Sequence, residues 1–193
     1  MVKSITFKES SDILNPAWGP NGNKIAFAGN VGGGTDLFVY RLAEDSLTQL
    51  THGRHTEILP TWGPNGEYLD YTTDRGKYTD FDSLKFGELQ LAMIDVKTGD
   101  WQLLPSFEKA KNINPQFGES ANQLYFLSDQ NGFSNIYRLN LENKVIEQMT
   151  NIATGVSGIS ANSPAMSVSD SGDLYFSVFN NRHYNIFKKN REQ

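Results

Sequence analysis

The residues of this chain whose spacing comes closest to a catalytic or metal-binding motif are two histidines and one serine. His52 and His55 lie three positions apart, without the glutamate and the helical context of the His-Glu-x-x-His zinc motif. Ser157 lies between Gly155 and Gly158, a spacing that differs from the Gly-x-Ser-x-Gly nucleophile elbow. Because neither place offers a third metal ligand or a base partner, we predict no catalytic residue, no metal site and no cofactor.

An insertion at residues 77–88 carries the remaining candidates. Asp80 and Asp82 both lie on it, whereas a glycosidase holds its two carboxyl groups on opposite sides of the sugar. Loops of this length in compact domains often serve binding. The alternative is that the aromatic side chains of the insertion fold back on the core. These aromatic residues are Tyr78, Phe81 and Phe86.

A recurring phrase shows how the rest of the chain is organised. It reads Asn15-Pro-Ala-Trp-Gly-Pro-Asn-Gly22 first and Leu59-Pro-Thr-Trp-Gly-Pro-Asn-Gly66 second, with looser copies that begin at Asn114 and Ser163. The leading prolines are 44, 55 and 49 residues apart, which is close to the length of a propeller blade. We therefore interpret the chain as a single domain of four repeats, roughly residues 12–53, 54–107, 108–152 and 153–193.

Each repeat carries short runs of β-branched and aromatic residues separated by turn residues. In the first repeat, Lys24–Ala28 is followed by Asp36–Leu42 and by the alternating run Ser46–Thr51. The period of two and the Asn-Gly turns predict four antiparallel strands per repeat. We therefore predict an all-β protein, a β-propeller of about four blades, each a four-stranded antiparallel sheet.

The last repeat lacks an outer strand, whereas Ser4-Ile-Thr-Phe-Lys8 alternates like one. We predict that residues 4–8 pair antiparallel with Tyr184–Phe187 and close the last blade, which removes an exposed sheet edge. Pairing within one chain gives a four-bladed ring, and reciprocal exchange between two chains gives an eight-bladed homodimer. A segment of a larger ring would show the same strand count, so the ring size stays open.

Charge and hydropathy argue against several classes of protein. The net charge of −5 argues against a nucleic-acid-binding surface, which needs clustered Lys and Arg. No apolar run approaches the length of a membrane span, and the first residues lack the apolar core of a signal peptide. We expect no direct membrane insertion. The chain has no cysteine and therefore no disulfide.

The repeat resembles that of the TolB-like β-propeller family of bacterial proteins. The resemblance rests on the phrase from Pro60 to Gly66, the corner Thr73-Asp-Arg-Gly76, the strand Ile136-Tyr-Arg-Leu-Asn140 and the closing pair Met149-Thr150. It covers essentially the whole chain, although family members usually have more than four blades. The resemblance implies a periplasmic or other extracytoplasmic location and a role in binding proteins, sometimes beside peptidase-like domains.

The linkers that join each outer strand to the next inner strand converge, in a propeller, around one mouth of the central channel. A polar ring at such a mouth is a typical place for a peptide or a small ligand. We predict that the ligand-binding residues are Asp12, Asn15, Arg54, His55, Glu57, Asn112, Asn114, Ser160 and Asn162. The alternative is a solvated rim with no ligand.

Large apolar residues at one shared position of the inner strands are expected to pack between blades. They are Trp18, Trp62, Phe117 and Met166. The function that we predict is a non-catalytic scaffold or recognition propeller for a protein or peptide partner. Two alternatives stay open: a propeller hydrolase of glycans or lactones, and a structural domain that gates a larger peptidase-bearing protein.

Overall fold

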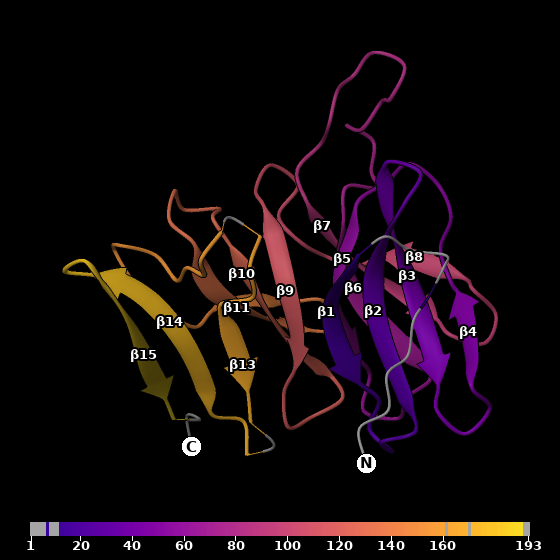
Figure 1. The fold of residues 1–193 in the computed structure, drawn as a ribbon. Helices are drawn as coiled ribbons and strands as arrows, with labels where there is room; N and C mark the ends of the chain where they lie inside the picture. Colours follow the sequence, from indigo (N-terminus) through magenta and orange to yellow (C-terminus); the bar gives the residue numbers. More distant parts are fainter. Residues whose placement is uncertain (1–6, 8–11, 161, 170, 191–193) are drawn as a thin grey trace.

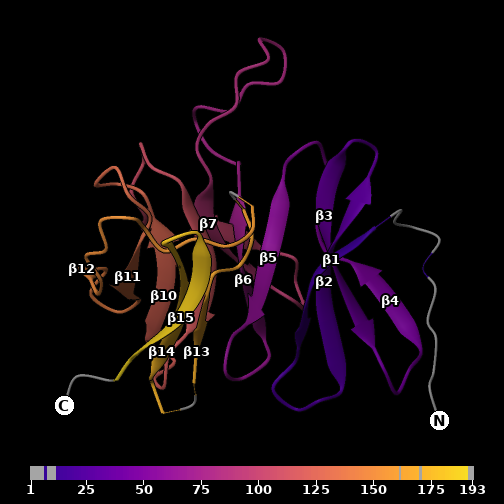
Figure 2. The same cartoon turned by 60° about the vertical axis from the view of Figure 1, so that its left-hand side comes forward.

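The computed structural model describes residue 7 and residues 12–160, 162–169 and 171–190. These residues form fifteen β-strands in four antiparallel sheets. The sheets stand side by side around a common axis as the blades of a propeller (Figures 1 and 2). The predicted all-β fold with four blades is therefore confirmed. The described residues include no helix of the length and apolar character that a membrane span requires.

Each blade follows the chain from its inner strand outward. Blade 1 consists of β1 (Ile13–Trp18), β2 (Lys24–Val31), β3 (Gly34–Arg41) and β4 (Ser46–Gln49). Blade 2 consists of β5 (Glu57–Trp62), β6 (Tyr68–Thr73), β7 (Gln90–Asp95) and β8 (Trp101–Leu103). Blade 3 consists of β9 (Asn112–Phe117), β10 (Gln123–Ser128), β11 (Asn135–Asn140) and β12 (Ile146–Gln148). The described part of blade 4 consists of β13 (Met166–Val168), β14 (Leu174–Asn180) and β15 (His183–Lys189).

The Pro-Asn-Gly turns join the inner strand of a blade to its second strand. Gly22 and Gly66 have φ angles of 64° and 70°, a left-handed conformation that glycine adopts without a Cβ clash. Each donates its N–H to the carbonyl of the residue three positions earlier, at 2.9 Å. The recurring phrase is therefore the turn chemistry that sets the hairpin register in blades 1 and 2.

The core lies between successive blades. Leu37 and Val39 of blade 1 belong to the same buried cluster as Leu69 and Tyr71 of blade 2. The cluster continues through Ile136 of blade 3 to residues of blade 4. The second and third strands of blades 1 to 3 are therefore largely buried on both faces, and each buried aliphatic side chain contributes about 1.5–3 kcal/mol of transfer free energy.

The predicted outer strand at residues 4–8 falls outside the described residues except for Phe7. The Phe7 ring stacks on Phe27 at 5.1 Å and meets Tyr40 at 5.4 Å, so Phe7 lies on blade 1. β15 lies at the opposite end of the arc of blades, at the left of Figure 1. The position of Phe7 thus differs from the predicted pairing with Tyr184–Phe187.

The inner-strand apolar residues are buried in three blades and exposed in one. Trp62 and Met166 are each 6% exposed and Phe117 is half-buried, as expected, but Trp18 is 63% exposed. The prediction for Trp18 was therefore wrong. The physical reason is that a tryptophan at this position packs against the preceding blade, as Trp62 of blade 2 does when it bonds the Ala17 carbonyl of blade 1. Among the described residues, no blade precedes blade 1.

Candidate functional site

The inner strands of blades 1 to 3 share a bulge at the residue before proline. Asn15, Leu59 and Asn114 have φ angles of 51°, 57° and 57°, in the left-handed region. The strand register shifts at the same place in each blade. A residue before proline is normally extended, and a left-handed residue other than glycine is strained. Such strain gathers at binding sites, so the bulges mark the first candidate site.

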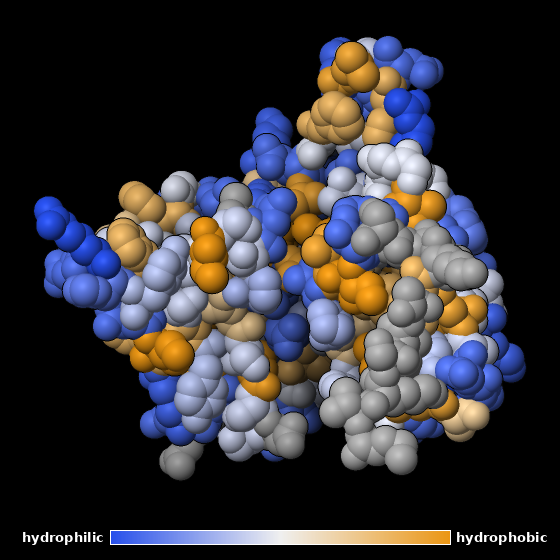
Figure 3. All heavy atoms as spheres, viewed as in Figure 1, coloured by the Kyte–Doolittle hydropathy of each residue, from blue (hydrophilic) through white to orange (hydrophobic). Residues whose placement is uncertain are grey.

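The three bulges line an open cleft on the channel side of the inner strands. The cleft has a volume of about 390 Å³, and the space-filling view is hollowed between the part with β13 and the part with β1 (Figure 3). Its walls are prolines, tryptophans and uncharged polar side chains, and none of the lining residues carries a charge. They are Asn15, Pro16, Ala17, Trp18, Pro20, Leu59, Pro60, Thr61, Trp62, Asn114, Gln116 and Pro164.

Hydrogen bonds between blades fix the shape of the cleft. The Trp62 indole N–H donates to the carbonyl of Ala17 at 3.1 Å and joins blade 2 to blade 1. The Ala165 and Met166 N–H groups donate to Asn114 Oδ1 at 3.0 and 3.2 Å and join blade 4 to blade 3. The walls of the cleft are therefore held in place by buried contacts that need no ligand.

Two of the predicted rim residues meet the insertion. The His55 Nδ1 atom lies 3.0 Å from Asp74 Oδ1, and its ring contacts the Phe81 ring at 4.8 Å. The guanidinium of Arg54 lies over the same Phe81 ring at 4.6 Å. Sequence reasoning missed this cluster because the insertion and the linker are separate in the chain. Phe81 is half-buried against the linker, whereas Tyr78 and Phe86 of the insertion are exposed, so the three aromatic residues do not fold back together.

Two other predicted residues are buried and have structural roles. Glu57 is fully buried and pairs with Arg75, and burial raises the pKa of its carboxyl group. Asn112 is buried, and its amide donates to the carbonyls of Leu89, Phe107 and Ala110. Neither side chain points to solvent, so neither is available for a ligand at the rim.

Three of the remaining predicted residues, Asp12, Ser160 and Asn162, lie outside the lining of the cleft. Asp12 accepts a hydrogen bond from the Asn30 amide at 2.8 Å. Ser160 bonds Ser163 at 2.8 Å beside a small pocket between blades 3 and 4, and Asn162 is exposed. Of the nine predicted residues, the structure brings Asn15 and Asn114 to the cleft and Arg54 and His55 to the insertion.

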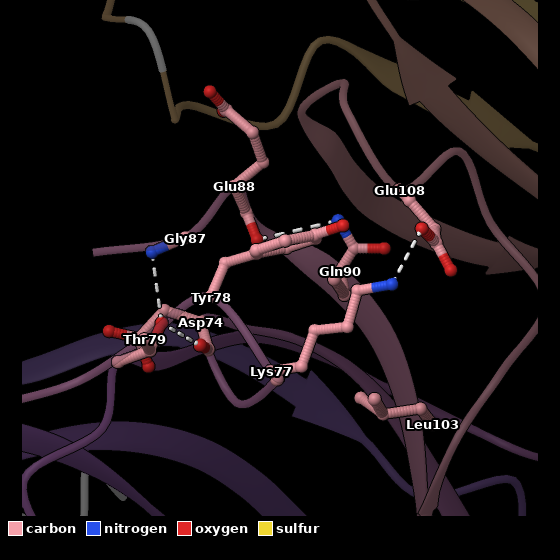
Figure 4. A pocket seen from close by; sticks show the side chains of 10 residues that line it. Asp74, Lys77, Tyr78, Thr79, Gly87, Glu88, Gln90, Leu103 and Glu108 are labelled. Atoms are coloured by element: carbon pink, nitrogen blue, oxygen red, sulfur yellow. Dashed lines mark hydrogen bonds and ion pairs between the residues drawn. The ribbon is translucent and has the colours of Figure 1, made fainter. Parts of the chain in front are cut away.

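The base of the insertion forms a second, smaller pocket of about 170 Å³ (Figure 4). Lys77 Nζ forms an ion pair with Glu108 Oε2 at 3.0 Å across its mouth, and the Gly87 N–H donates to Thr79 Oγ1 at 3.0 Å. The Tyr78 ring lies between these two contacts in the close-up view. The Lys77–Glu108 pair is exposed and contributes little stability.

The tip of the insertion is an ordered turn. Asp80 and Lys85 exchange two backbone hydrogen bonds at 2.8 and 2.9 Å. The Asp80 carboxylate accepts hydrogen bonds from the Ser83 hydroxyl and from two backbone N–H groups, and these lower its pKa. The Asp80 carboxylate therefore stabilises a turn at the tip of the insertion, the loop between β6 and β7 that projects from the blades (Figure 2), and Leu84 and Phe86 of this tip are exposed.

One buried acid lies outside both candidate sites. Asp70 in β6 is fully buried, and neither carboxyl oxygen has a hydrogen-bond partner among the described residues. Burial raises its pKa to about 8. The group is therefore largely neutral at pH 7 and affects stability rather than binding.

No protein-family model matches this chain, and no curated protein matches it. Solved structures are similar in fold. The chain aligns with TolB from Acinetobacter baumannii at a TM-score of 0.70 and 16% identity, over 93% of this chain and 41% of that one. A puromycin hydrolase aligns at a TM-score of 0.70 and 15% identity, over 97% of this chain and 28% of the hydrolase. Dipeptidyl peptidase 4 from Porphyromonas gingivalis aligns at a TM-score of 0.61 and 12% identity, over 95% of this chain and 32% of the peptidase.

The chain therefore spans less than half the length of these three proteins. At such low identity the likeness concerns the fold alone. Together with the four blades and their recurring turn phrase, it leads to one conclusion: the chain has a TolB-like β-propeller fold.

Proposed function

We propose that the chain is a non-catalytic binding propeller that holds an extended segment of a protein or peptide in the cleft between its inner strands. The observation that carries the proposal is the cleft itself, with its three strained bulges and its ties between blades. A site that is formed before the ligand arrives loses less conformational entropy on binding.

The lining of the cleft suits a peptide. Trp18 offers a large exposed ring against which an apolar side chain can pack. Thr61 and Gln116 supply hydrogen-bond donors and acceptors that match a peptide backbone. Because the lining residues carry no charge, we expect affinity that depends only weakly on salt.

The proposal is tested by screening an array of short random peptides and measuring the best binder by calorimetry. Trp18→Ala is expected to weaken that binder about tenfold or more, a loss of about 1.4 kcal/mol, with the melting temperature unchanged. Phe133→Ala, which truncates a similarly exposed aromatic residue outside the cleft, is the matched control. Equal affinity of the wild type and the Trp18 variant would contradict the proposal.

We also propose an extracytoplasmic, envelope-associated location in a bacterium. The support is the repeat resemblance and the fold shared with TolB. Fractionation of the producing cells tests it, and recovery of the protein only from the cytosol would contradict it.

A second candidate is a structural domain that gates a peptidase-type protein. It is favoured by the likeness to the puromycin hydrolase and to dipeptidyl peptidase 4, each of which the chain covers only in part. Under either candidate we propose that the chain itself is non-catalytic, so we expect no turnover of peptide, ester or glycan substrates. Turnover that disappears in His55→Ala or Asp80→Asn would contradict both.

A further inference from the structure

The outer edge of blade 4 differs from the outer edges of the other blades. In blades 1 to 3 the third strand pairs with a fourth strand, β4, β8 or β12. Among the described residues, β15 pairs with β14 on one side only. It lies at one end of the arc of blades, at the left of Figure 1.

Three aromatic pairs identify the equivalent residues of blades 1, 3 and 4. Each is a stacked cross-strand pair between the second and third strands: Phe27–Phe38, Phe126–Tyr137 and Phe176–Phe187. The two residues before the second ring are therefore equivalent too. They are Asp36-Leu37 in β3, Asn135-Ile136 in β11 and Asn185-Ile186 in β15.

In blades 1 and 3, the residues after the fourth strand bind this dipeptide. Thr51 Oγ1 accepts the Leu37 N–H at 2.8 Å and donates to Asp36 Oδ1 at 3.4 Å. Thr150 Oγ1 accepts the Ile136 N–H at 2.9 Å and donates to Asn135 Oδ1 at 3.0 Å. The preceding apolar residue, Leu50 or Met149, donates its N–H to the carbonyl of Leu37 or Ile136 at 2.8 Å.

The equivalent groups of blade 4 face an open edge. The Ser177 N–H donates to the Ala165 carbonyl, so the backbone groups of Ser177 face away from β15. Ile186 lies opposite Ser177, and in an antiparallel pair its own N–H and carbonyl must then point away from β14. Ile186 is 82% exposed, whereas Leu37 and Ile136 are fully buried, and the side-chain amide of Asn185 has no hydrogen bond among the described residues.

The charge of this edge indicates the chemistry of its partner. Residues 181–190 include Arg182, Lys188 and Lys189 and no acidic residue. Lys188 occupies the position of Arg138, whose guanidinium binds Glu147 of the fourth strand β12 at 2.6 Å. Lys188 Nζ also pairs with Asp173 Oδ2 of the same blade at 2.8 Å. An acidic residue at the Glu147 position of an added strand would lie opposite Lys188, on a strand that carries no negative charge of its own.

We propose that β15 is a strand-acceptor edge that binds an extended segment of a partner polypeptide in the manner of β12 on β11, with an acidic residue of the segment opposite Lys188. The segment pairs antiparallel with β15 and ends in an apolar residue followed by Thr or Ser. Its main chain bonds the free groups of Ile186, its hydroxyl bonds Asn185, and its apolar residues cover Ile186.

The test uses a labelled peptide with the sequence of residues 143–153 of this chain, which contains Glu147 and Met149-Thr150. Binding is measured by fluorescence anisotropy, and hydrogen exchange locates the contact. We expect protection of residues 183–189 and at least about tenfold weaker binding to Ile186→Asp. Leu84→Asp, which changes an exposed aliphatic residue of the insertion tip, is the matched control and should bind like the wild type.

Two altered peptides examine the chemistry of the segment. A peptide with Thr150→Val should bind about tenfold more weakly, because it cannot bond Asn185 or the Ile186 N–H. A peptide with Lys144→Glu should bind more tightly at low salt, and the gain should shrink as salt is added. Melting curves and the milder Ile186→Ser variant show whether the Asp variant keeps its fold.

Absence of peptide binding, or equal binding to wild type and Ile186→Asp with both folded, would overturn the proposal. It would also be overturned if the protein forms a dimer that Ile186→Asp disrupts and that the peptide does not displace, because a second copy would then cover the edge. The cleft between the inner strands is unchanged in all these variants, so the result is independent of the proposed function.

Discussion

Blades 3 and 4 carry nearly the same short sequence in their third strands, but the copy in blade 3 is buried and the copy in blade 4 is exposed. Asn135-Ile136-Tyr137 in β11 is buried, whereas the exposed copy, Asn185-Ile186-Phe187, forms the centre of β15. In blade 3, residues 149–152 after β12 satisfy the Ile136 backbone and the Asn135 side chain. The comparison shows that the burial of a third-strand residue depends on whether a fourth strand and the residues after it cover that strand, and not on the residue type alone.

The largest expected effect compares the two isoleucines. Ile136→Ala should lower the free energy of unfolding by about 2–5 kcal/mol, because it opens a cavity in the core between blades 3 and 4. Ile186→Ala should change it by less than about 0.5 kcal/mol, because the side chain is exposed. Urea denaturation of both variants checks this. Similar losses in the two variants would mean that β15 is covered in solution.

A pH titration extends the comparison of covered and uncovered strands to blade 2. Asp70 lies in β6 of this blade and is fully buried, unlike the residues of the exposed edge strand β15. Its pKa is raised to about 8, so the folded state holds this proton more tightly than the unfolded state. Its contribution to stability is therefore full below about pH 4 and is lost as the pH rises toward 8, by at most about 1.4 kcal/mol per pH unit.

We expect Asp70→Asn to remove this slope, so that the variant gains about 2–3 kcal/mol of unfolding free energy relative to the wild type from pH 5 to pH 7. The measurement is urea denaturation at several pH values. A difference that does not change with pH would show that the carboxyl group is hydrated in the folded protein.

A smaller effect concerns the hydroxyl that anchors the third blade. Thr150→Val keeps the shape of the side chain but leaves the Ile136 N–H without its hydroxyl acceptor, at a cost of about 1 kcal/mol, whereas Asn135 Oδ1 loses one donor and keeps the Ile152 N–H. Asn185→Ala, at the equivalent place in blade 4, should leave thermal stability unchanged. If Asn185→Ala is the more destabilising change, the equivalence of the two edges is wrong.

Much of the fold could be predicted from the sequence because the signals are local. The Pro-Asn-Gly turns and the alternation of the strands that follow them define hairpins without any knowledge of neighbouring blades. The exposure of Trp18 could not be predicted, because it depends on whether another blade precedes the first. The same limit applies to Ile186, whose sequence context matches that of the buried Ile136.

The candidate site was predicted only in part. Asparagine tolerates a left-handed backbone, so Asn15 and Asn114 carry a sequence signal for the bulges. Leu59 adopts the same conformation, but leucine gives no such signal. Glu57 and Asn112 lie in the predicted linker regions yet point inward, since Arg75 binds Glu57 and the distant Leu89 carbonyl is one of the groups that bind Asn112. The direction of a side chain in a linker depends on such distant partners.

The most direct test of the difference between the two blades is hydrogen exchange of the free protein, compared between residues 135–140 in β11 and residues 183–189 in β15. We predict that the β11 amides, the Ile136 N–H among them, exchange only through large openings of the structure, whereas the outward N–H of Ile186 exchanges rapidly. Strong protection of Ile186, comparable to that of Ile136, would contradict the account.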